Sequence, residues 1–248
     1  MAQIYGKTFS YPDGSGYVMI YKQAHSTYDS GPEKKKKERD DLFELSEEER
    51  DEENAGRSAR RSKKAVRDYV ACNTFTHFVT LTFRDEQSGK DDYRLKVLTN
   101  WLRYMKKKHG KFNYVVIPER HKDGRLHFHG AVDLTEFELE KAYNKETGKP
   151  IIRHGNHVRD IIEWQKNNGW GSAEIIRDQK KTANYMTKYI TKDFETTVSK
   201  HKKKYWCSKG LNKPVQKSLR VLPQFSRPAD WENDFVIIYN IDDMNSIL

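Results

Sequence analysis

The sequence predicts an α+β domain in which helices pack on a mostly antiparallel sheet. Three observations support this fold class. Segments that alternate apolar and polar residues follow one another with segments that place apolar residues at helical spacing. The turn signal Asp123-Gly124 joins two strand-like segments directly, as in an antiparallel hairpin. The chain has 248 residues, 35% hydrophobic and 33% charged, so one modest core with solvated appendages is expected rather than two full domains.

The first half of the predicted domain consists of a strand, a helix and a hairpin. Residues 77–83 (HFVTLTF) alternate and are rich in Val, Thr and Phe, which favours a strand. Apolar residues recur at helical spacing over residues 91–108, and basic residues crowd the end of this segment, where the helix dipole favours them. The two hairpin strands are expected over residues 112–118 and 126–134.

The second half is less regular. Residues 135–143 are expected to be helical. Residues 144–171 are rich in Gly, Asn and charge, and we interpret them as an insertion around an apolar island. A short strand is predicted over residues 173–176 and a helix over residues 178–193. Residues 204–222 are expected to be irregular and to end in a strand.

An N-terminal extension is expected over residues 1–64, because charge dominates much of it. The whole chain carries 46 Lys and Arg against 36 Asp and Glu, a net charge of +10. Residues 26–64 hold 11 basic and 12 acidic residues and few apolar ones, so alone they cannot bury enough surface to offset their ordering entropy. We expect a mobile or helical linker there, which can dock through Leu42, Phe43 and Leu45.

Residues 65–228, the predicted domain, keep an excess of 15 positive charges, which points to a polyanionic partner. Residues 229–248 form a tail with five acidic residues and no Lys or Arg. The tail has two interpretations. It folds over the basic surface and competes with nucleic acid, or it packs as an edge strand through residues 235–239 (FVIIY). The apolar run favours packing.

Composition excludes several classes of protein. No run approaches the roughly 18 apolar residues that a transmembrane helix needs, and the first residues lack an apolar stretch of signal-peptide length. Cys72 and Cys207 are too few for a disulfide scaffold or a Cys-rich zinc site. No G-x-x-x-x-G-K-[ST] motif occurs, so no ATP site is expected. We therefore expect a cytoplasmic protein with no membrane partner.

The candidate metal site is centred on the segment Leu126–Gly130. Residues i and i+2 of a strand point to the same face, so His127 and His129 would project together while Phe128 points into the core. Pairing of the hairpin strands would bring Glu119 to the same place. Two imidazoles and a carboxylate suit a divalent metal. The alternative is two surface histidines or one satisfied core histidine, but Gly130, where a ligand can approach closely, favours the metal site.

A second constellation lies in the last predicted helix, where a Y-x-x-K pattern occurs twice with an offset of four residues. Tyr185 and Tyr189 would share one helix face, and Lys188 and Lys192 would form a parallel stripe. A phenol is a poor nucleophile at neutral pH, but a nearby cation can stabilise the phenolate or position a phosphate. The alternative is an amphipathic helix with half-buried tyrosines and snorkelling lysines. Together with the metal pair, the pattern predicts tyrosine attack on a phosphodiester.

Basic clusters and a tryptophan supply candidate nucleic-acid contacts. Lysines position a phosphate backbone without reading its sequence, and a tryptophan beside basic residues can stack on an unpaired base. Each can equally belong to a solvated face or to the core. The insertion at 144–171 and the segment 204–214 are candidates for sequence-specific readout. The candidate contacts are Lys106, Lys107, Lys108, Lys180, Lys181, Lys202, Lys203, Lys204 and Trp206.

These motifs resemble those of the HUH superfamily of tyrosine endonucleases, and specifically the rolling-circle replication initiators of bacterial plasmids, phages and satellite elements. The resemblance covers about residues 76–215. The apolar first motif of the family matches residues 78–83. The second and third motifs match His127 and His129, with Glu119 as the acidic ligand, and Tyr185 with Lys188.

The resemblance implies a five-stranded central sheet with the histidine pair on one strand and the tyrosine on a facing helix. It implies a Mn²⁺ or Mg²⁺ cofactor and an enzyme that nicks single-stranded or extruded origin DNA, leaving a 5′-phosphotyrosine and a free 3′-OH that primes synthesis. The doubling to Tyr189 is similar to two-tyrosine initiators. A host helicase and polymerase would be partners. The alternatives are a related single-strand transposase or relaxase-like strand transferase, and a non-catalytic protein that binds single-stranded DNA.

Overall fold

The chain divides into two compact units, and their boundaries differ from the predicted ones. In the computed structural model, one unit comprises Glu47–Asn212, and the other combines the two ends of the chain, Met1–Ser46 and Lys213–Leu248. The structure describes residues 3–26, 47–84, 91–121, 124–190 and 203–247. The expected docking residues Leu42, Phe43 and Leu45 therefore lie outside the described residues.

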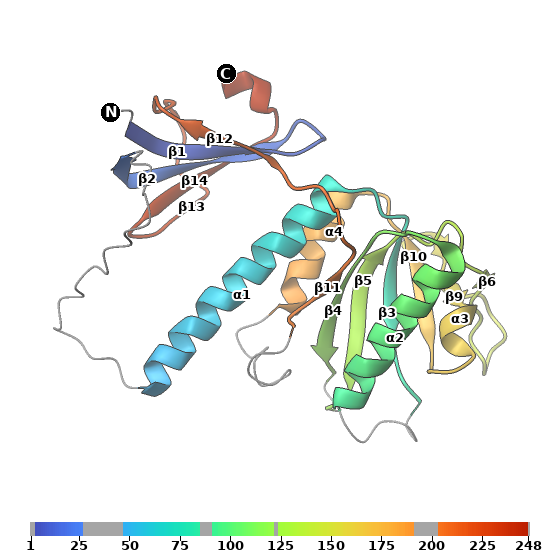
Figure 1. The fold of residues 1–248 in the computed structure, drawn as a ribbon. Coiled ribbons are helices and arrows are strands. Elements are labelled where there is room, and N and C mark those ends of the chain that lie inside the picture. Colours follow the sequence, from blue (N-terminus) through green and yellow to red (C-terminus); the bar gives the residue numbers. More distant parts are fainter. Residues whose placement is uncertain (1–2, 27–46, 85–90, 122–123, 191–202, 248) are drawn as a thin grey trace. The chain divides into compact units, whose positions relative to one another are not determined.

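An antiparallel sheet of seven strands forms the centre of the 47–212 unit (Figure 1), which agrees with the predicted α+β class. The resemblance implied five strands; the difference arises from short strands at the margins. In sheet order the strands are β11 (Trp206–Cys207), β4 (Tyr114–Arg120), β5 (Leu126–Val132), β3 (His77–Leu81), β10 (Gly171–Ile175), β9 (Arg159–Ile161) and β6 (Leu139–Lys141).

The pairing of β5 with its two neighbours fixes which side chains share a face. In the hairpin β4–β5, Glu119 is the register partner of His127 and Ile117 is the partner of His129. On the other side of β5, Thr80 of β3 is also the partner of His129. Because directly opposed residues point to the same face of a sheet, all of these side chains project together.

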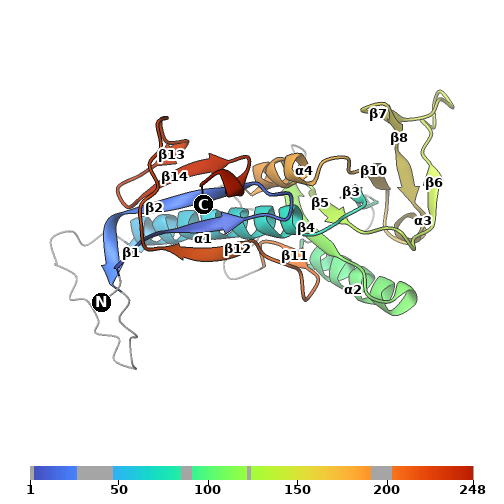
Figure 2. The same cartoon turned by 90° about the horizontal axis from the view of Figure 1, so that it is seen from above.

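Helices cover both faces of the sheet. Helix α2 (Asp91–His109) covers one face, and α4 (Gln179–Met186) lies against the other (Figure 2). Helix α1 (Glu47–Cys72) packs against α4. It contains residues 47–64, so this part of the charged segment is helical, as one of the two predicted forms requires. Two acidic residues in the first turn and basic residues in the last turn of α2 match the helix dipole.

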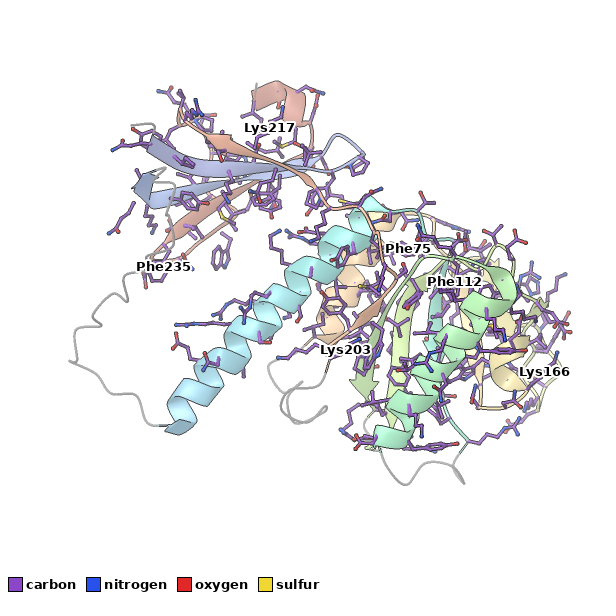
Figure 3. All side chains as sticks on the ribbon, viewed as in Figure 1. Phe75, Phe112, Lys166, Lys203, Lys217 and Phe235 are labelled. Carbon is purple, nitrogen blue, oxygen red and sulfur yellow. The ribbon has the colours of Figure 1, made fainter. Side chains whose placement is uncertain are left out.

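The face under α2 carries the hydrophobic core. Phe128 is completely buried there and meets the rings of Phe83 and Trp206 edge-on, as the alternation along the strand predicted. Phe75 and Phe112 belong to the same buried cluster (Figure 3). The histidines thus lie on the face opposite the main apolar packing of β5.

The predicted helix over residues 135–143 is wrong. Asp133 accepts hydrogen bonds from the backbone N–H and the hydroxyl of Thr135, which forms a turn, and Leu139–Lys141 then pairs with β9 as strand β6. The insertion that follows contains a small hairpin and a short helix. Its elements are β7 (Ile152–Arg153), β8 (Asn156–His157) and α3 (Ile162–Gln165).

The last helix of this unit is shorter than predicted. Asp178 caps its N-terminus by accepting a hydrogen bond from Lys181 N at 2.9 Å. Helix α4 ends at Met186 and tightens into the 3₁₀ turn η2 (Thr187–Tyr189). Ile190 then leaves the helical conformation, with φ −96° and ψ 85°. Residues 191–193 lie outside the described residues.

Strands from both ends of the chain build the second unit, an antiparallel five-stranded sheet. The sequence assigned these ends to separate regions, because backbone pairing between distant segments leaves no local pattern. The acidic tail packs as a strand, but between two neighbours rather than at the predicted edge. In sheet order the strands are β12 (Val215–Leu219), β1 (Gln3–Ser10), β2 (Gly16–Ser26), β14 (Val236–Ile241) and β13 (Trp231–Glu232).

Within the described residues, no helix combines the length and the apolar character that crossing a bilayer requires.

Gly130 contacts a neighbouring strand rather than a ligand. A Cβ atom there would lie 2.8 Å from Val115 O and 2.9 Å from Val116 Cγ2 of β4. We expect Gly130→Ala to reduce the free energy of unfolding by about 1–3 kcal/mol, because β4 must shift to admit the methyl group. Denaturant unfolding measures the loss. As a control, Gly56→Ala in α1 meets its nearest neighbour at 3.6 Å and should be neutral or stabilising; equal effects at the two sites would contradict the packing explanation.

Candidate active site

His129 lies at the centre of the cluster on the face of α4. Its side chain is buried, with only 8% of the residue exposed. Nε2 lies 2.6 Å from Glu119 Oε2, and Nδ1 lies 3.1 Å from the hydroxyl of Thr80. Because an ionised carboxylate can only accept, we assign the proton of the neutral ring to Nε2, and the Thr80 hydroxyl then donates to Nδ1. Both ring nitrogens are therefore held in fixed roles.

Glu119 is kept ionised by its surroundings. The hydrogen bond from His129 lowers the pKa of this carboxyl, and the charges of His129, His127 and His121 add to that effect. Partial burial acts in the opposite direction but does not outweigh them. The site thus presents a carboxylate at neutral pH, which is the form that would accept a proton or bind a cation.

His127 lies on the same face but has a different neighbour. It is the register partner of Glu119, and its ring stacks on that of His121, with centroids 4.9 Å apart. Sequence reasoning missed His121, although its position two residues after Glu119, at the end of the hairpin strand, was a usable signal. Across the part of the chain that the structure describes, no three His, Cys, Asp or Glu side chains are already arranged as a metal-binding group.

The donor set nevertheless fits a divalent cation in its chemistry. Glu119 Oε2 and His129 Nε2 face each other, and the proton between them is the one that a metal ion displaces when a histidine becomes a ligand. His127 adds a second imidazole from the same face of the hairpin. A carboxylate with two imidazoles suits Mn²⁺ better than Mg²⁺, because Mg²⁺ prefers oxygen ligands.

The two tyrosines meet above His129. The ring of Tyr189 stacks on His129 with centroids 4.3 Å apart and an interplanar angle of 11°. Its hydroxyl donates a hydrogen bond of 2.7 Å to the hydroxyl of Tyr185. The offset of four residues places both phenols on one side, as predicted, even though η2 replaces the last α-helical turn. Glu119, His129, Tyr189 and Tyr185 therefore form one continuous chain of contacts.

The environments of the two phenols differ. Burial strongly raises the pKa of Tyr189; its hydrogen bond to Tyr185 and the negative charges of Glu119 and Glu174 raise it further. Tyr189 thus remains protonated and acts as a donor. Tyr185 is 46% exposed, and Lys188 Nζ lies 5.6 Å from the centroid of its ring. Tyr185 is therefore the accessible phenol, with a donor at its oxygen and a cation over its ring.

Phe78 completes this aromatic cluster, and sequence reasoning did not identify it as part of the site. Its ring meets Tyr185 edge-on at 5.5 Å and lies parallel to His129 at 5.8 Å. Thr80, which bonds His129, follows two residues later on the same strand. Both fall within residues 78–83, the first matched motif, so the signal was present but was assigned to the strand alone.

Several predicted nucleic-acid contacts lie around one cavity of about 560 Å³ between α1, α2, β4 and β11. Its lining includes Lys106, Lys203, Lys204, Trp206 and Arg103. The structure thus brings together basic and aromatic side chains that are almost 100 residues apart in the sequence, a combination that can hold a nucleic-acid strand.

The other predicted contacts are not part of that group. Lys108 forms an ion pair of 3.2 Å with buried Glu163, which His109 also contacts, so Lys108 anchors α2 rather than facing a ligand freely. Lys181 lies 3.7 Å from Asp178. Lys107 and Lys180 are exposed on their helices. Lys192 and Lys202 lie outside the described residues.

Comparison with known proteins gives one match. Residues 76–194 match the model of a family described as "Replication-associated protein", of the ORF2 type. No curated protein and no solved structure matches the chain. The matched segment contains the entire cluster of Glu119, His127, His129, Tyr185 and Tyr189, and it supports the assignment of a replication initiator protein.

The Glu119–His129 bond predicts a pH dependence of stability. Because the pKa of Glu119 is lower in the folded state than its unfolded value of about 4.3, the bond stabilises the protein above that value, and the contribution is lost as the pH falls through the folded pKa. We expect Glu119→Gln to be less stable than the wild type at pH 7 and the difference to shrink below about pH 4. Denaturant unfolding in EDTA at a series of pH values measures it. A difference independent of pH would contradict the assignment.

Proposed function

We propose that the 47–212 unit is a metal-dependent DNA endonuclease and strand transferase of the HUH superfamily, which starts rolling-circle replication by nicking a single-stranded or extruded origin. The observation that carries the proposal is the continuous contact from Glu119 through His129 and Tyr189 to Tyr185. It joins an ionised carboxylate and an imidazole to an exposed phenol, within a segment that matches a replication-associated family.

Tyr185 is the proposed first nucleophile. Its phenol oxygen attacks phosphorus and loses its proton to solvent or to a basic side chain, while the bond between phosphorus and the 3′-oxygen breaks. The protein then holds a 5′-phosphotyrosine, and the 3′-oxygen takes up a proton and can prime synthesis. The hydrogen bond from Tyr189 stabilises negative charge on the attacking oxygen, and Lys188 provides a nearby cation.

Glu119, His127 and His129 would hold Mn²⁺ or Mg²⁺ in this proposal. When bound, the ion would polarise an oxygen of the scissile phosphate. The chain's own residues prepare that site: Thr80 orients the ring of His129, and the surrounding histidines keep Glu119 ionised. The stacked ring of Tyr189 covers one side of His129 and excludes water from it.

The second tyrosine suits a later step. Tyr189 is a protonated donor while Tyr185 is free, which supports the order in which Tyr185 acts first. Once Tyr185 carries the 5′-phosphate, its oxygen becomes an ester oxygen, and Tyr189 can take the second strand when the replicated circle is released. Attack by a free 3′-OH on the phosphotyrosine closes the circle. A host helicase and polymerase would supply unwinding and synthesis.

Two other functions use the same residues. A single-strand transposase or relaxase-like strand transferase would perform the same chemistry, but the family match favours replication. A non-catalytic protein that binds single-stranded DNA would need the basic surface alone. The ordered contacts around His129 favour an enzyme, because binding does not require them.

Loss of either imidazole tests the metal. We expect His127→Ala and His129→Ala each to reduce nicking of single-stranded DNA by at least about a hundredfold while the affinity for the DNA changes little. Nicking should also stop in EDTA and return with Mn²⁺. Gel analysis of a labelled strand gives the rate, and fluorescence anisotropy gives the affinity. Undiminished nicking by the double variant would refute the metal site.

Removal of each hydroxyl tests the division between the tyrosines. We expect Tyr185→Phe to abolish the first nick and its covalent adduct. Tyr189→Phe should retain the first nick, slowed up to about tenfold by the loss of one hydrogen bond, and should impair the second transfer. Peptide mass mapping of the adduct identifies the nucleophile. An adduct on Tyr189 alone would reverse the order, and adducts on neither tyrosine would exclude the mechanism.

A further inference from the structure

A second cavity adjoins Tyr185 on the side of the insertion. Its volume is about 570 Å³, within the range of about 300–1,000 Å³ typical of small-ligand sites. One wall is the hairpin β7–β8, another is the end of β10 with the residues that follow it, and α4 supplies Lys181, Thr182 and Tyr185. Tyr185 thus belongs both to this cavity and to the cluster around His129.

The wall next to Tyr185 is apolar and partly uncovered. Phe78 lines the cavity beside Tyr185, and Ile175 and Ile176 continue the apolar surface at the end of β10. Ile175 is 48% exposed, although its strand begins with three buried residues. An aromatic and aliphatic surface of this kind can pack against the flat face of an unpaired base.

The opposite wall is polar and fixed in place. Arg153 of β7 forms an ion pair of 2.8 Å with Glu174 of β10, which ties the small hairpin to the main sheet. Asn156 of β8 lines the cavity with an amide that can both donate and accept. His157 lines it as well, and its Nδ1 atom is buried without a hydrogen-bond partner among the described residues. A buried polar atom of this kind calls for a partner, which a ligand can supply.

The charge of the cavity suits a nucleotide better than a polyphosphate. Arg153, Arg177 and Lys181 provide three cations, and Glu174 and Asp178 provide two carboxylates. The ion pairs of Arg153 with Glu174 and of Lys181 with Asp178 leave a weak net positive charge. One phosphodiester and one base with mixed donors and acceptors match this lining.

We propose that this cavity is a nucleotide subsite, in which the hairpin β7–β8 and β10 hold and read one unpaired base next to the phosphate that Tyr185 attacks. The inference depends on the proposed function, because it is the nicked strand that would place a nucleotide there. The ends of any strand attacked at Tyr185 must leave along its neighbours, and this cavity borders that side chain. Asn156 and His157 would bond the edge of the base, and Phe78 and Ile175 would contact its face.

The test compares cleavage preferences of the full chain. A pool of single-stranded oligonucleotides with a randomised central segment is cut with Mn²⁺ present, and the strands retained on the protein are sequenced. We expect Asn156→Ala, and His157→Gln as a conservative second variant, to reduce base discrimination roughly tenfold at one position beside the cut and to spare the other positions. Lys149→Ala, a change on the same insertion but outside the cavity lining, should leave the preference unaltered.

A second measurement keeps the subsite testable apart from nicking. Short single-stranded DNA that contains 2-aminopurine is titrated against Tyr185→Phe protein, with and without Asn156→Ala. We expect roughly tenfold weaker binding with Asn156→Ala and no change with Lys149→Ala. If the wild type nicks but Asn156→Ala and His157→Gln keep its base preference, the subsite is refuted while the proposed function stands. Equal competition by inorganic phosphate and by a deoxynucleotide would reduce the cavity to an anion site. Absence of nicking by the wild type would refute the proposed function, and the titration would still decide the subsite.

Discussion

The register of β5 between β4 and β3 is the constraint on which the candidate site depends. It makes Glu119 and Thr80 neighbours of the two histidines from opposite sides. A slip by one residue would turn both histidines toward the core and Phe128 toward α4. The register is held on the other face, where Phe128 is buried and Gly130 allows β4 to approach closely. The core and the site are therefore two consequences of the same pairing.

Burial of His129 determines the chemistry of the groups around it. A buried imidazole needs partners for both nitrogens, and Thr80 and Glu119 supply them. The bond to His129 lowers the pKa of Glu119, while burial under α4 raises that of Tyr189. Two phenols four residues apart thus differ in character: one is a buried donor and the other an exposed acceptor. The direction of their hydrogen bond follows from the packing rather than from the repeat itself.

The division into units separates this site from the ends of the chain. The central segment Glu47–Asn212 contains the cluster and both cavities, whereas the ends pair with each other in a sheet of their own. The insertion within the central unit combines regular structure with surface function. Its small hairpin is tied to β10 by the Arg153–Glu174 pair and borders the accessible tyrosine.

The sequence by itself determined the site strands and their faces, because alternation and spacing are local properties of the backbone. The pattern H-x-H on a strand, the carboxylate across a hairpin and the four-residue offset of Tyr185 and Tyr189 were all sufficient for that. Only the tertiary structure decided which groups pair. The contacts of Thr80, Phe78 and His121, the anchoring of Lys108 by Glu163, and the sheet shared by the two chain ends join residues far apart in the sequence. Such contacts depend on burial and long-range pairing, which leave no periodic signal in the chain.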